Sequence, residues 1–381
     1  MSKVALITGA NGITGSAILE HLAKHTTASE WSRIIISSRS PLNATVSDPR
    51  VEFIALDFSN PPEKLAEQMR DSCAHVTHAY FSSYVHSDDF AELNRMNCFL
   101  FENFLSALTS VAKGLQNCTL QTGGKYYNVH TQPVPWPARE DHPRLASAEE
   151  NFYYHQEDFL AQQQQQQQQR GSNWTWNVIR PEAIIGCTTK SNGMNEALTI
   201  ALYFLINKEL GLEAPMPSNF AYYNGTDDIS DARLIADLTI YVSTHPHCAN
   251  EAFNITNGDF FSWRYMWPRL AEWFGARASS DQTFTKTSFA DGETHLDVSF
   301  ENWAKDKREV WYNLCDRLGS SERKSTFDAG TWAFQDWVFR RTWSAPLSMN
   351  KARKFGWTGH IDSFESLTDA FTRFKELGQI P

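Results

Sequence analysis

The 381-residue sequence predicts an α/β fold in which helices cover a doubly wound, mostly parallel sheet. Three observations support this class. The chain begins with a short apolar strand, Val4 to Ile7, that runs into a turn built on Gly9, Gly12 and Gly15. Short apolar segments then alternate with segments of helical periodicity. No internal repeat of about 20 to 50 residues interrupts this alternation.

The glycine turn, which leads into a helix starting near Ser16, is the first predicted cofactor contact. In doubly wound folds such a turn places backbone N–H groups and the positive end of a helix against a pyrophosphate. Side chains on the glycines would block that approach. The residues expected at this contact are Gly9, Asn11, Gly12, Ile13 and Gly15. A glycine turn alone is weak evidence, so an ordinary strand-to-helix turn is the alternative.

The second strand, Arg33 to Ser37, ends at Ser38 and Arg39. An acidic residue at this place binds the ribose hydroxyls of NAD, whereas an arginine accommodates the additional phosphate of NADP. Both residues are therefore expected at the cofactor, and Arg39 predicts NADPH. A solvated surface arginine is the alternative.

The third strand, Val51 to Leu56, ends at Asp57 and Phe58. A carboxylate here can bond the adenine amino group, and an aromatic ring can lie along the base. The alternative for Asp57 is a helix N-cap, because Ser-Asn-Pro-Pro follows. The fourth strand, His75 to Phe81, leads into a loop beginning at Ser82, which is expected beside the nicotinamide.

The helix from Glu92 to Val111 carries apolar residues at helical spacing, which are expected to form core rather than site: Leu93, Met96, Phe99, Leu100, Phe104 and Leu108. A fifth strand, Asn117 to Gln121, ends in Thr122, Gly123, Gly124 and Lys125. Ligands of open parallel sheets bind outside the C-terminal ends of the strands. Thr122, Gly123 and Lys125 are therefore candidate site residues.

Tyr154 lies in a segment of helical spacing, and Asp158 follows it by four residues. Four sequence runs near this tyrosine are distinctive: QTGGKYY (121–127), REDHPR (139–144), NFYYHQED (151–158) and VIRPEAIIG (178–186). Three later runs agree with them: DDISDARLIAD (227–237), NEAFNITNGDFFSW (250–263) and SMNKARKFGW (348–357). Together they resemble the progesterone 5β-reductase and iridoid synthase family of atypical, extended short-chain dehydrogenases/reductases. The usual YxxxK dyad of short-chain dehydrogenases is missing here.

The resemblance implies a Rossmann-type fold and an NADPH-dependent reductase of α,β-unsaturated carbonyl compounds. It implies that Lys125 and Tyr154 are catalytic, with hydride delivered to the β-carbon, Tyr154 donating a hydrogen bond to the enolate oxygen and Lys125 supplying positive charge. Tyr153 points about 100° away around the same helix and is expected to pack. After the sixth strand, Trp176 to Ile179, the resemblance places Pro181 and Ile184 beside the nicotinamide.

Residues 1–190 are expected to form mainly the cofactor-binding domain and residues 191–381 mainly the substrate-binding part, with about 225–260 returning to the main sheet. Phe253 to Thr256 is the strand expected there. Phe334, Trp337, Phe339 and Trp343 are candidate pocket walls, although core packing explains any one of them equally well. Glutamines 162–169 are expected to extend the helix of Tyr154 until Gly171 ends it.

The net charge of -10 and the absence of a basic run argue against a nucleic-acid or membrane partner. No apolar run approaches about 20 residues, so a cytoplasmic protein is expected. Six scattered cysteines predict reduced thiols and no metal site. The expected partner is a small apolar carbonyl substrate, and a homodimer stays open. Two alternatives also stay open: a ketone or aldehyde reductase, and a non-catalytic NADPH-binding regulator.

Overall fold

The computed structural model describes residues 2–41, 46–87, 89–145, 151–189 and 193–381. Its centre is a seven-stranded sheet in the order β3-β2-β1-β4-β5-β6-β9, and every neighbouring pair is parallel. The strands are β1 (Lys3–Thr8), β2 (Trp31–Ser38), β3 (Val51–Ala55), β4 (His78–Phe81), β5 (Asn117–Gln121), β6 (Thr175–Pro181) and β9 (Glu251–Ile255). This order reverses between β1 and β4, as in a Rossmann fold. The predicted fold class is confirmed.

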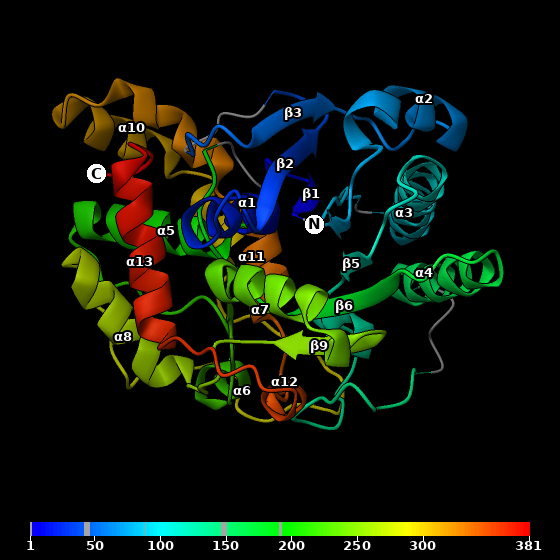
Figure 1. Cartoon of the computed structure of the whole chain (residues 1–381). Coiled ribbons are helices and arrows are strands. Elements are labelled where there is room, and N and C mark those ends of the chain that lie inside the picture. The colour runs from blue at the N-terminus through cyan, green and yellow to red at the C-terminus, as the bar shows by residue number, and fades with distance from the viewer. Residues whose placement is uncertain (1, 42–45, 88, 146–150, 190–192) are drawn as a thin grey trace.

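Helices cover both faces of the sheet (Figure 1). Side chains of a strand alternate between its two faces, so Leu6 and Ile35 pack on one side while Ile7 and Ile34 pack on the other. The first side is covered by α2 (Pro62–Cys73), α3 (Phe90–Val111) and α4 (Phe152–Gln169), and the second by α1 (Ile13–His25) and α7 (Ala232–Thr244). Both faces of each central strand are therefore buried, which explains their continuous apolar sequences.

The glycine turn that joins β1 to α1 packs closely against neighbouring backbone. Gly9 has φ +64°, and a Cβ there would lie 2.7 Å from the Ser82 carbonyl oxygen. A Cβ on Gly15 would run into the Gly9 carbonyl oxygen. Both glycines are therefore required by backbone packing. Gly12 is the N-cap of α1.

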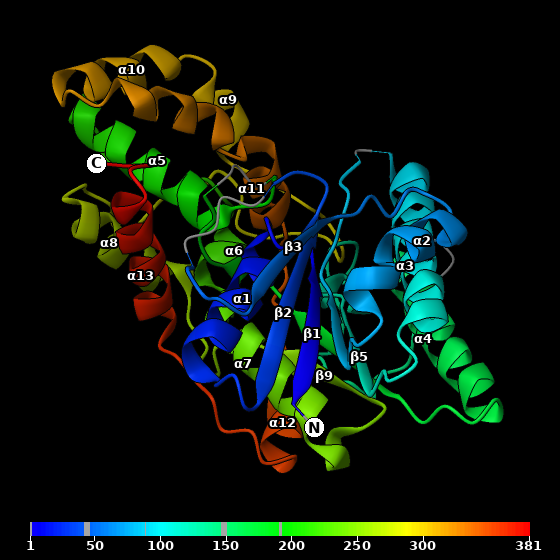
Figure 2. The same cartoon turned by 45° about the horizontal axis from the view of Figure 1, so that its top comes forward.

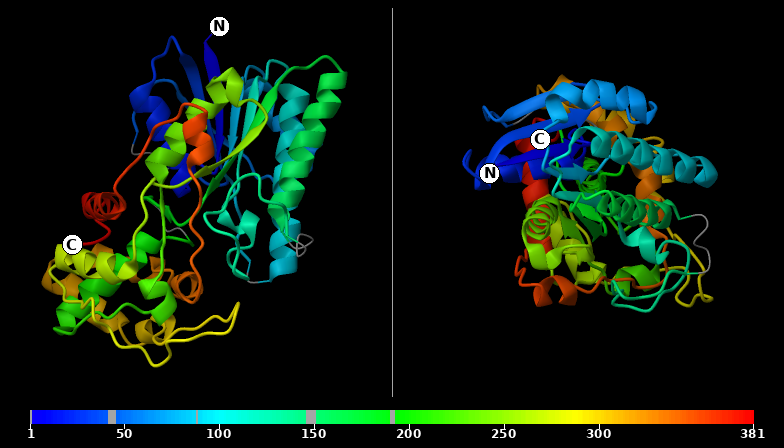
Figure 3. Two further views of the ribbon diagram at one scale, coloured as in Figure 1. Left: turned by 90° about the horizontal axis from the view of Figure 1, so that it is seen from below. Right: turned by 45° about the vertical axis from the view of Figure 1, so that its right-hand side comes forward.

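A second core lies beside the sheet and consists mainly of helices from the C-terminal half, as Figures 2 and 3 show. It is built from α5 (Glu196–Leu210), α6 (Phe220–Asn224), α8 (Trp263–Phe274), α9 (Phe300–Ala304), α10 (Arg308–Arg317), η4 (Ser321–Ala329), α11 (Trp332–Phe339) and α13 (Ser363–Glu376). The remaining short elements are η1 (Gly124–Tyr127), η3 (Pro246–Cys248), α12 (Asn350–Lys354) and the paired strands β7 (Ile184–Ile185) and β8 (Ser230–Asp231). Phe253 lies in β9, which forms one edge of the main sheet.

The glutamine run continues α4 to Gln169, as predicted. Gly171, with φ +88°, lies just past the helix end. One member of the run differs from the expected solvated helix: Gln164 is buried, and its Nε2 donates to the carbonyl of Trp174 at 3.2 Å. Within the described ranges, no helix combines the length and the apolar character needed to cross a membrane.

Candidate active site

A cavity of about 960 Å³ opens outside the C-terminal ends of β1, β4, β5 and β6. Its wall runs from the glycine turn to α11 of the C-terminal part. It lies at the point where the strand order reverses, which is where doubly wound sheets bind their ligands. This cavity is the candidate active site.

Nearly all of the predicted cofactor contacts line this cavity: Gly9, Asn11, Gly12, Ile13, Ser38, Arg39, Asp57, Phe58, Ser82, Thr122, Gly123, Pro181 and Ile184. Gly15 is the exception, because it packs against the backbone of Gly9 instead. Its role is to let α1 approach the turn, and the expectation of a direct contact is corrected.

Asn11, Ser38, Arg39 and Ser40 form the end of the cavity next to β2. The Nδ2 of Asn11 donates to Ser38 Oγ at 3.0 Å and to the Ser40 carbonyl at 3.2 Å. These bonds tie the loop after β2 to the glycine turn. Arg39 lies between the two bonded residues, is exposed and borders the cavity. An arginine so placed fits the phosphate role that the sequence predicts.

Asp57 and Phe58, which follow β3, have different surroundings. The ring of Phe58 packs against Phe81 and Phe104 and is 4% exposed, so most of it belongs to the core and only a small part borders the cavity. Asp57 borders the cavity, and its Oδ1 accepts from the backbone N–H and hydroxyl of Ser59. The N-cap of α2 is Pro61, so Asp57 is not the helix cap.

Three of the α3 residues that were expected to form core also line the cavity: Met96, Phe99 and Leu100. Phe99 is 50% exposed, and it borders the cavity together with Met96. Of the four aromatic candidates in the C-terminal part, Phe334 and Trp337 of α11 line the cavity. Phe339, in contrast, is fully buried in the helical core. Apolar surface therefore faces the cavity from both halves of the chain.

Lys125 lies in η1, directly after β5. Its ammonium nitrogen is 4.8 Å from the ring centroid of Trp337, within the range of a cation–π interaction. Burial lowers the pKa of this amine to about 8. The ring of His130 packs against Trp337 in a tilted arrangement with the centroids 5.7 Å apart, and burial lowers the pKa of His130 to about 3, so it is neutral at pH 7. Lys125 thus places an easily lost positive charge on the cavity wall.

The structure does not bring Tyr154 to the cavity. This tyrosine is 3% exposed, its hydroxyl donates to the Tyr126 carbonyl at 2.7 Å, and the guanidinium of Arg144 covers its ring at 4.7 Å. Tyr153 lines the cavity instead. Its hydroxyl lies 3.3 Å from the point that a Cβ on Gly123 would occupy. The assignment of the two tyrosines from sequence is therefore corrected: Tyr154 packs and Tyr153 faces the site.

Asn151 connects this tyrosine to the lysine loop. Its Oδ1 accepts from the backbone N–H of Tyr153, which caps α4, while its Nδ2 donates to the Lys125 carbonyl at 2.8 Å. One side chain thus fixes the first turn of α4 against η1. The backbone segments that carry the phenol and the amine are therefore tied to each other.

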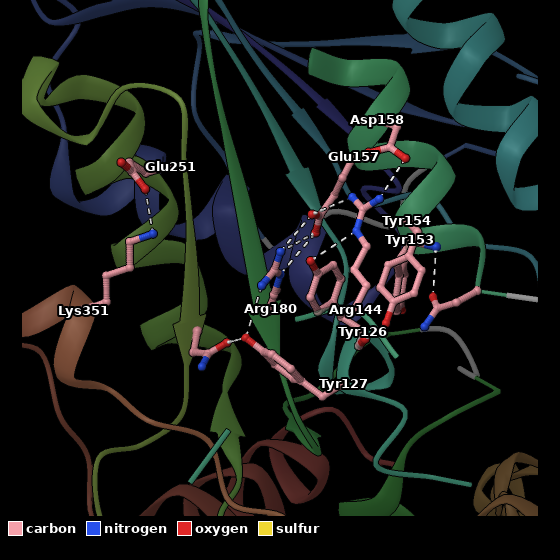
Figure 4. Close-up of polar contacts among 12 residues, drawn as sticks. Tyr126, Tyr127, Arg144, Tyr153, Tyr154, Glu157, Asp158, Arg180, Glu251 and Lys351 are labelled. Atoms are coloured by element: carbon pink, nitrogen blue, oxygen red, sulfur yellow. Dashed lines mark hydrogen bonds and ion pairs between the residues drawn. The ribbon is translucent and has the colours of Figure 1, made fainter. Parts of the chain in front are cut away.

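A buried ion pair fixes the rotation of α4 (Figure 4). Arg180, 2% exposed on β6, donates to Glu157 at 2.8 Å and lies 3.4 Å above the ring of Tyr126. Its Nη1 also donates to the hydroxyl of Tyr127 at 3.2 Å. Asp158, one residue further, pairs with Arg144 at 2.8 Å on the exposed side. The network holds the face of α4 that carries Tyr154 away from the cavity.

Several buried polar atoms on the cavity wall suit a polar ligand. The hydroxyl of Thr122, the Oε1 of Gln121 and the hydroxyl of Tyr84 have no hydrogen-bond partner among the residues that the structure describes. Buried polar groups are normally paired, so these atoms fit a bound molecule with its own donors and acceptors. Tyr84 belongs to the loop after β4 that the sequence placed beside the nicotinamide, whereas Gln121 was not predicted as a site residue and no local pattern marks it.

Comparison with known proteins agrees with this geometry. A family model described as a PRISE-like Rossmann-fold domain matches residues 5–371. The short chain dehydrogenase gsfE of Penicillium aethiopicum is 58% identical over 381 residues, covering 100% of both chains. The (S)-8-oxocitronellyl enol synthase ISY1 of Nepeta cataria is 30% identical over 385 residues, covering 100% of this chain and 93% of the relative.

Among solved structures, the Bordetella bronchiseptica enzyme WbmH in complex with NAD+ superposes with a TM-score of 0.63. The match covers 99% of this chain and 100% of the other at 14% identity. At this identity the likeness shows the fold alone. It agrees with the doubly wound sheet described above.

The Glu157→Gln substitution should lower the free energy of unfolding by about 3 kcal/mol, because it leaves the buried guanidinium of Arg180 without its anion. Asp158→Asn is the matched control. Its ion pair is exposed, so the change should stay below about 1 kcal/mol. Urea denaturation measures both. Equal losses in the two variants would contradict a special role for the buried pair.

Proposed function

This chain belongs to the PRISE-like Rossmann-fold family of extended short-chain dehydrogenases/reductases, and on that premise we propose that it is an NADPH-dependent reductase of α,β-unsaturated carbonyl compounds. It is an oxidoreductase of the short-chain dehydrogenase/reductase type. One observation carries the finer proposal. A phenol, Tyr153, and an amine, Lys125, reach the same cavity from separate elements in a chain that lacks the usual YxxxK dyad.

The residues of the glycine turn would hold the pyrophosphate of NADPH, and Arg39 would bind the phosphate on its adenosine ribose. Thr122 and Pro181 border the part of the cavity where the nicotinamide would lie. When bound, the reduced nicotinamide supplies the hydride. The described residues in this region fit such a cofactor. Unpartnered polar atoms could bond to it, and the glycine turn leaves no room for a side chain.

Tyr153 is suited to stabilise the negative charge that develops on the substrate carbonyl oxygen. Burial raises the pKa of its phenol, so the hydroxyl stays a neutral donor at pH 7. One donor aimed at a developing oxyanion contributes roughly 3 kcal/mol. Lys125 adds positive charge on the same wall, where low local dielectric strengthens its effect. The two groups together favour an enolate.

The substrate would be largely apolar. Phe99, Met96, Phe334 and Trp337 offer hydrophobic surface to a molecule in the cavity. The enol synthase relative supports an enone as substrate class. Purified protein mixed with NADPH and a panel of small enones tests the proposal through loss of NADPH absorbance. Product analysis then distinguishes double-bond from carbonyl reduction.

Tyr153→Phe should lower turnover of an enone by a factor of roughly 100 or more, because it removes the donor to the oxyanion. Tyr154→Phe is the matched control, since it removes the adjacent hydroxyl without touching the cavity. That control should retain turnover within a factor of about three. Steady-state kinetics decide between them, with NADPH fluorescence as a check on cofactor binding. The reverse ranking would refute the assignment.

Activity should decline as the pH rises through about 8, because Lys125 loses its proton there. The pH profile of kcat/KM reports ionisations of the free enzyme. Burial raises the pKa of Glu196, also on the cavity wall, to about 7, so that group titrates below this limb. Lys125→Arg keeps its charge at all these pH values and should move the decline to higher pH. An unchanged alkaline limb in that variant would exclude Lys125 as its source.

Arg39→Asp should reduce the preference for NADPH over NADH by roughly tenfold or more, since it replaces a charge-assisted bond to phosphate by repulsion. The comparison needs dissociation constants for both cofactors, measured by fluorescence. Arg70→Asp, an identical change of charge on the exposed side of α2, controls for the general effect of surface charge. A preference equal to that of the control would refute a phosphate contact.

A further inference from the structure

Four buried carboxyl groups gather around one guanidinium beside the cavity. Arg341 donates through Nη1 to Glu182 Oε1 at 2.8 Å, and its Nη2 lies 3.5 Å from Asp227 Oδ1. Asp228 accepts from the backbone N–H of Leu347 at 2.9 Å. Glu196, 5% exposed, accepts from Gln335 at 3.1 Å. Of these residues, Glu182, Glu196 and Arg341 line the cavity itself.

Carboxyl groups outnumber the guanidinium in this cluster. Fully ionised, its four carboxylates and one guanidinium would carry a net charge of 1 − 4 = −3. Burying an uncompensated charge is costly, so carboxyl groups in such a place take up protons instead. Burial raises the pKa of Glu182 and of Asp228, and raises that of Glu196 to about 7. Burial in this cluster therefore favours the protonated forms of Glu182, Asp228 and Glu196.

Glu182 is the member that is placed to release a proton. Its side chain is 10% exposed, and its Oε2, which is itself buried, has no hydrogen-bond partner among the described residues. That oxygen lies 3.0 Å from the point that a Cβ on Gly124 would occupy. On the preceding residue, Gly123, the corresponding point is 3.3 Å from the hydroxyl of Tyr153. Consecutive Cα atoms are about 3.8 Å apart. The carboxyl and the phenol thus flank neighbouring residues of one loop at the cavity.

We propose that Glu182 is the catalytic acid that completes the reduction, by giving the proton on Oε2 to the α-carbon of the enolate. The proposal rests on the enone reductase function. Hydride from NADPH forms the new bond to the β-carbon and leaves an electron pair shared between the α-carbon and the oxygen. The O–H bond of Glu182 breaks, and that pair forms the new C–H bond at the α-carbon. Glu182 is left as a carboxylate beside Arg341, and water restores its proton.

This placement gives Tyr153 and Glu182 different roles. Tyr153 holds the carbonyl oxygen, and Glu182 approaches the α-carbon from the wall formed after β6. A fixed donor delivers its proton to one face of a planar enolate. Water protonates a released enolate on both faces, although the walls of the cavity can also restrict water to one face. Loss of the preference when Glu182 is changed therefore reports whether Glu182 is the donor.

The test uses the full-length protein with NADPH and 2-methylcyclohex-2-en-1-one in D₂O. Protonation of this substrate at its α-carbon creates a single stereocentre, and chiral gas chromatography with mass detection reads both its configuration and its label. The wild type should give one enantiomer in large excess, with deuterium at that carbon. A racemic product sampled early from the wild type would overturn the proposal, and this measurement does not depend on any variant folding.

Glu182→Gln keeps the shape of the side chain and removes the acid. It should lower turnover at least tenfold, because general acids contribute roughly 100-fold or more, and should bring the enantiomer ratio close to one. Glu182→Asp keeps a carboxyl and should preserve part of the excess. A Gln variant with wild-type rate and wild-type ratio would overturn the proposal. NADPH fluorescence and circular dichroism confirm that each variant binds cofactor and is folded.

Glu251→Gln is the control, because its carboxylate pairs with Lys351 at 2.7 Å on the edge strand and does not border the cavity. Rate and ratio should both match the wild type. The experiment distinguishes failure of the proposed reductase function from failure of the acid role of Glu182. A wild type that consumes NADPH with none of the enones refutes the proposed function and, with it, the acid. A wild type that reduces the enone while Glu182→Gln behaves identically refutes the acid alone.

Discussion

The ion pair between Arg180 and Glu157 decides which side of α4 faces the cavity. It joins the last helix of one sheet face to the strand on which that helix packs, and both partners are removed from water. Stacking of the same guanidinium on Tyr126 adds a second constraint on its position. Because a helix is rigid, fixing one residue near its start fixes the direction of its neighbours. The phenol at the site is placed by a contact that never touches the substrate.

Around this anchor the two halves of the chain have different tasks. The sheet supplies backbone for the cofactor, through the turn at Gly9 and the ends of β5 and β6. The helical part supplies α11 and Arg341, whose side chains close the cavity. A cation–π contact between Lys125 and Trp337 crosses the boundary between them. The chemistry that we propose therefore depends on the docking of the C-terminal helices onto the sheet.

Much of the fold could be predicted from the sequence because strands and turns are local. The seven strands, their parallel arrangement and the return of β9 follow from apolar runs and glycine positions. The choice between Tyr153 and Tyr154 could not. Helical periodicity gives the angle between two side chains, but the phase of α4 is set by Arg180, which is distant in sequence. The packing of Phe58 against Phe104 of α3 is likewise a contact between residues distant in sequence. Glu182 and Arg341 are separated by 159 positions, so no motif could connect them.

The glutamine run has a consequence for how this gene can vary. Each residue added to a helix extends it by about 1.5 Å and turns its end by about 100°. Here the run starts after Glu157 and Leu160 have already locked α4 in place, and it ends in an exposed turn at Gly171. Changes in its length are absorbed downstream of Gln164, on the solvent side. Alleles with longer or shorter runs should therefore share one catalytic geometry.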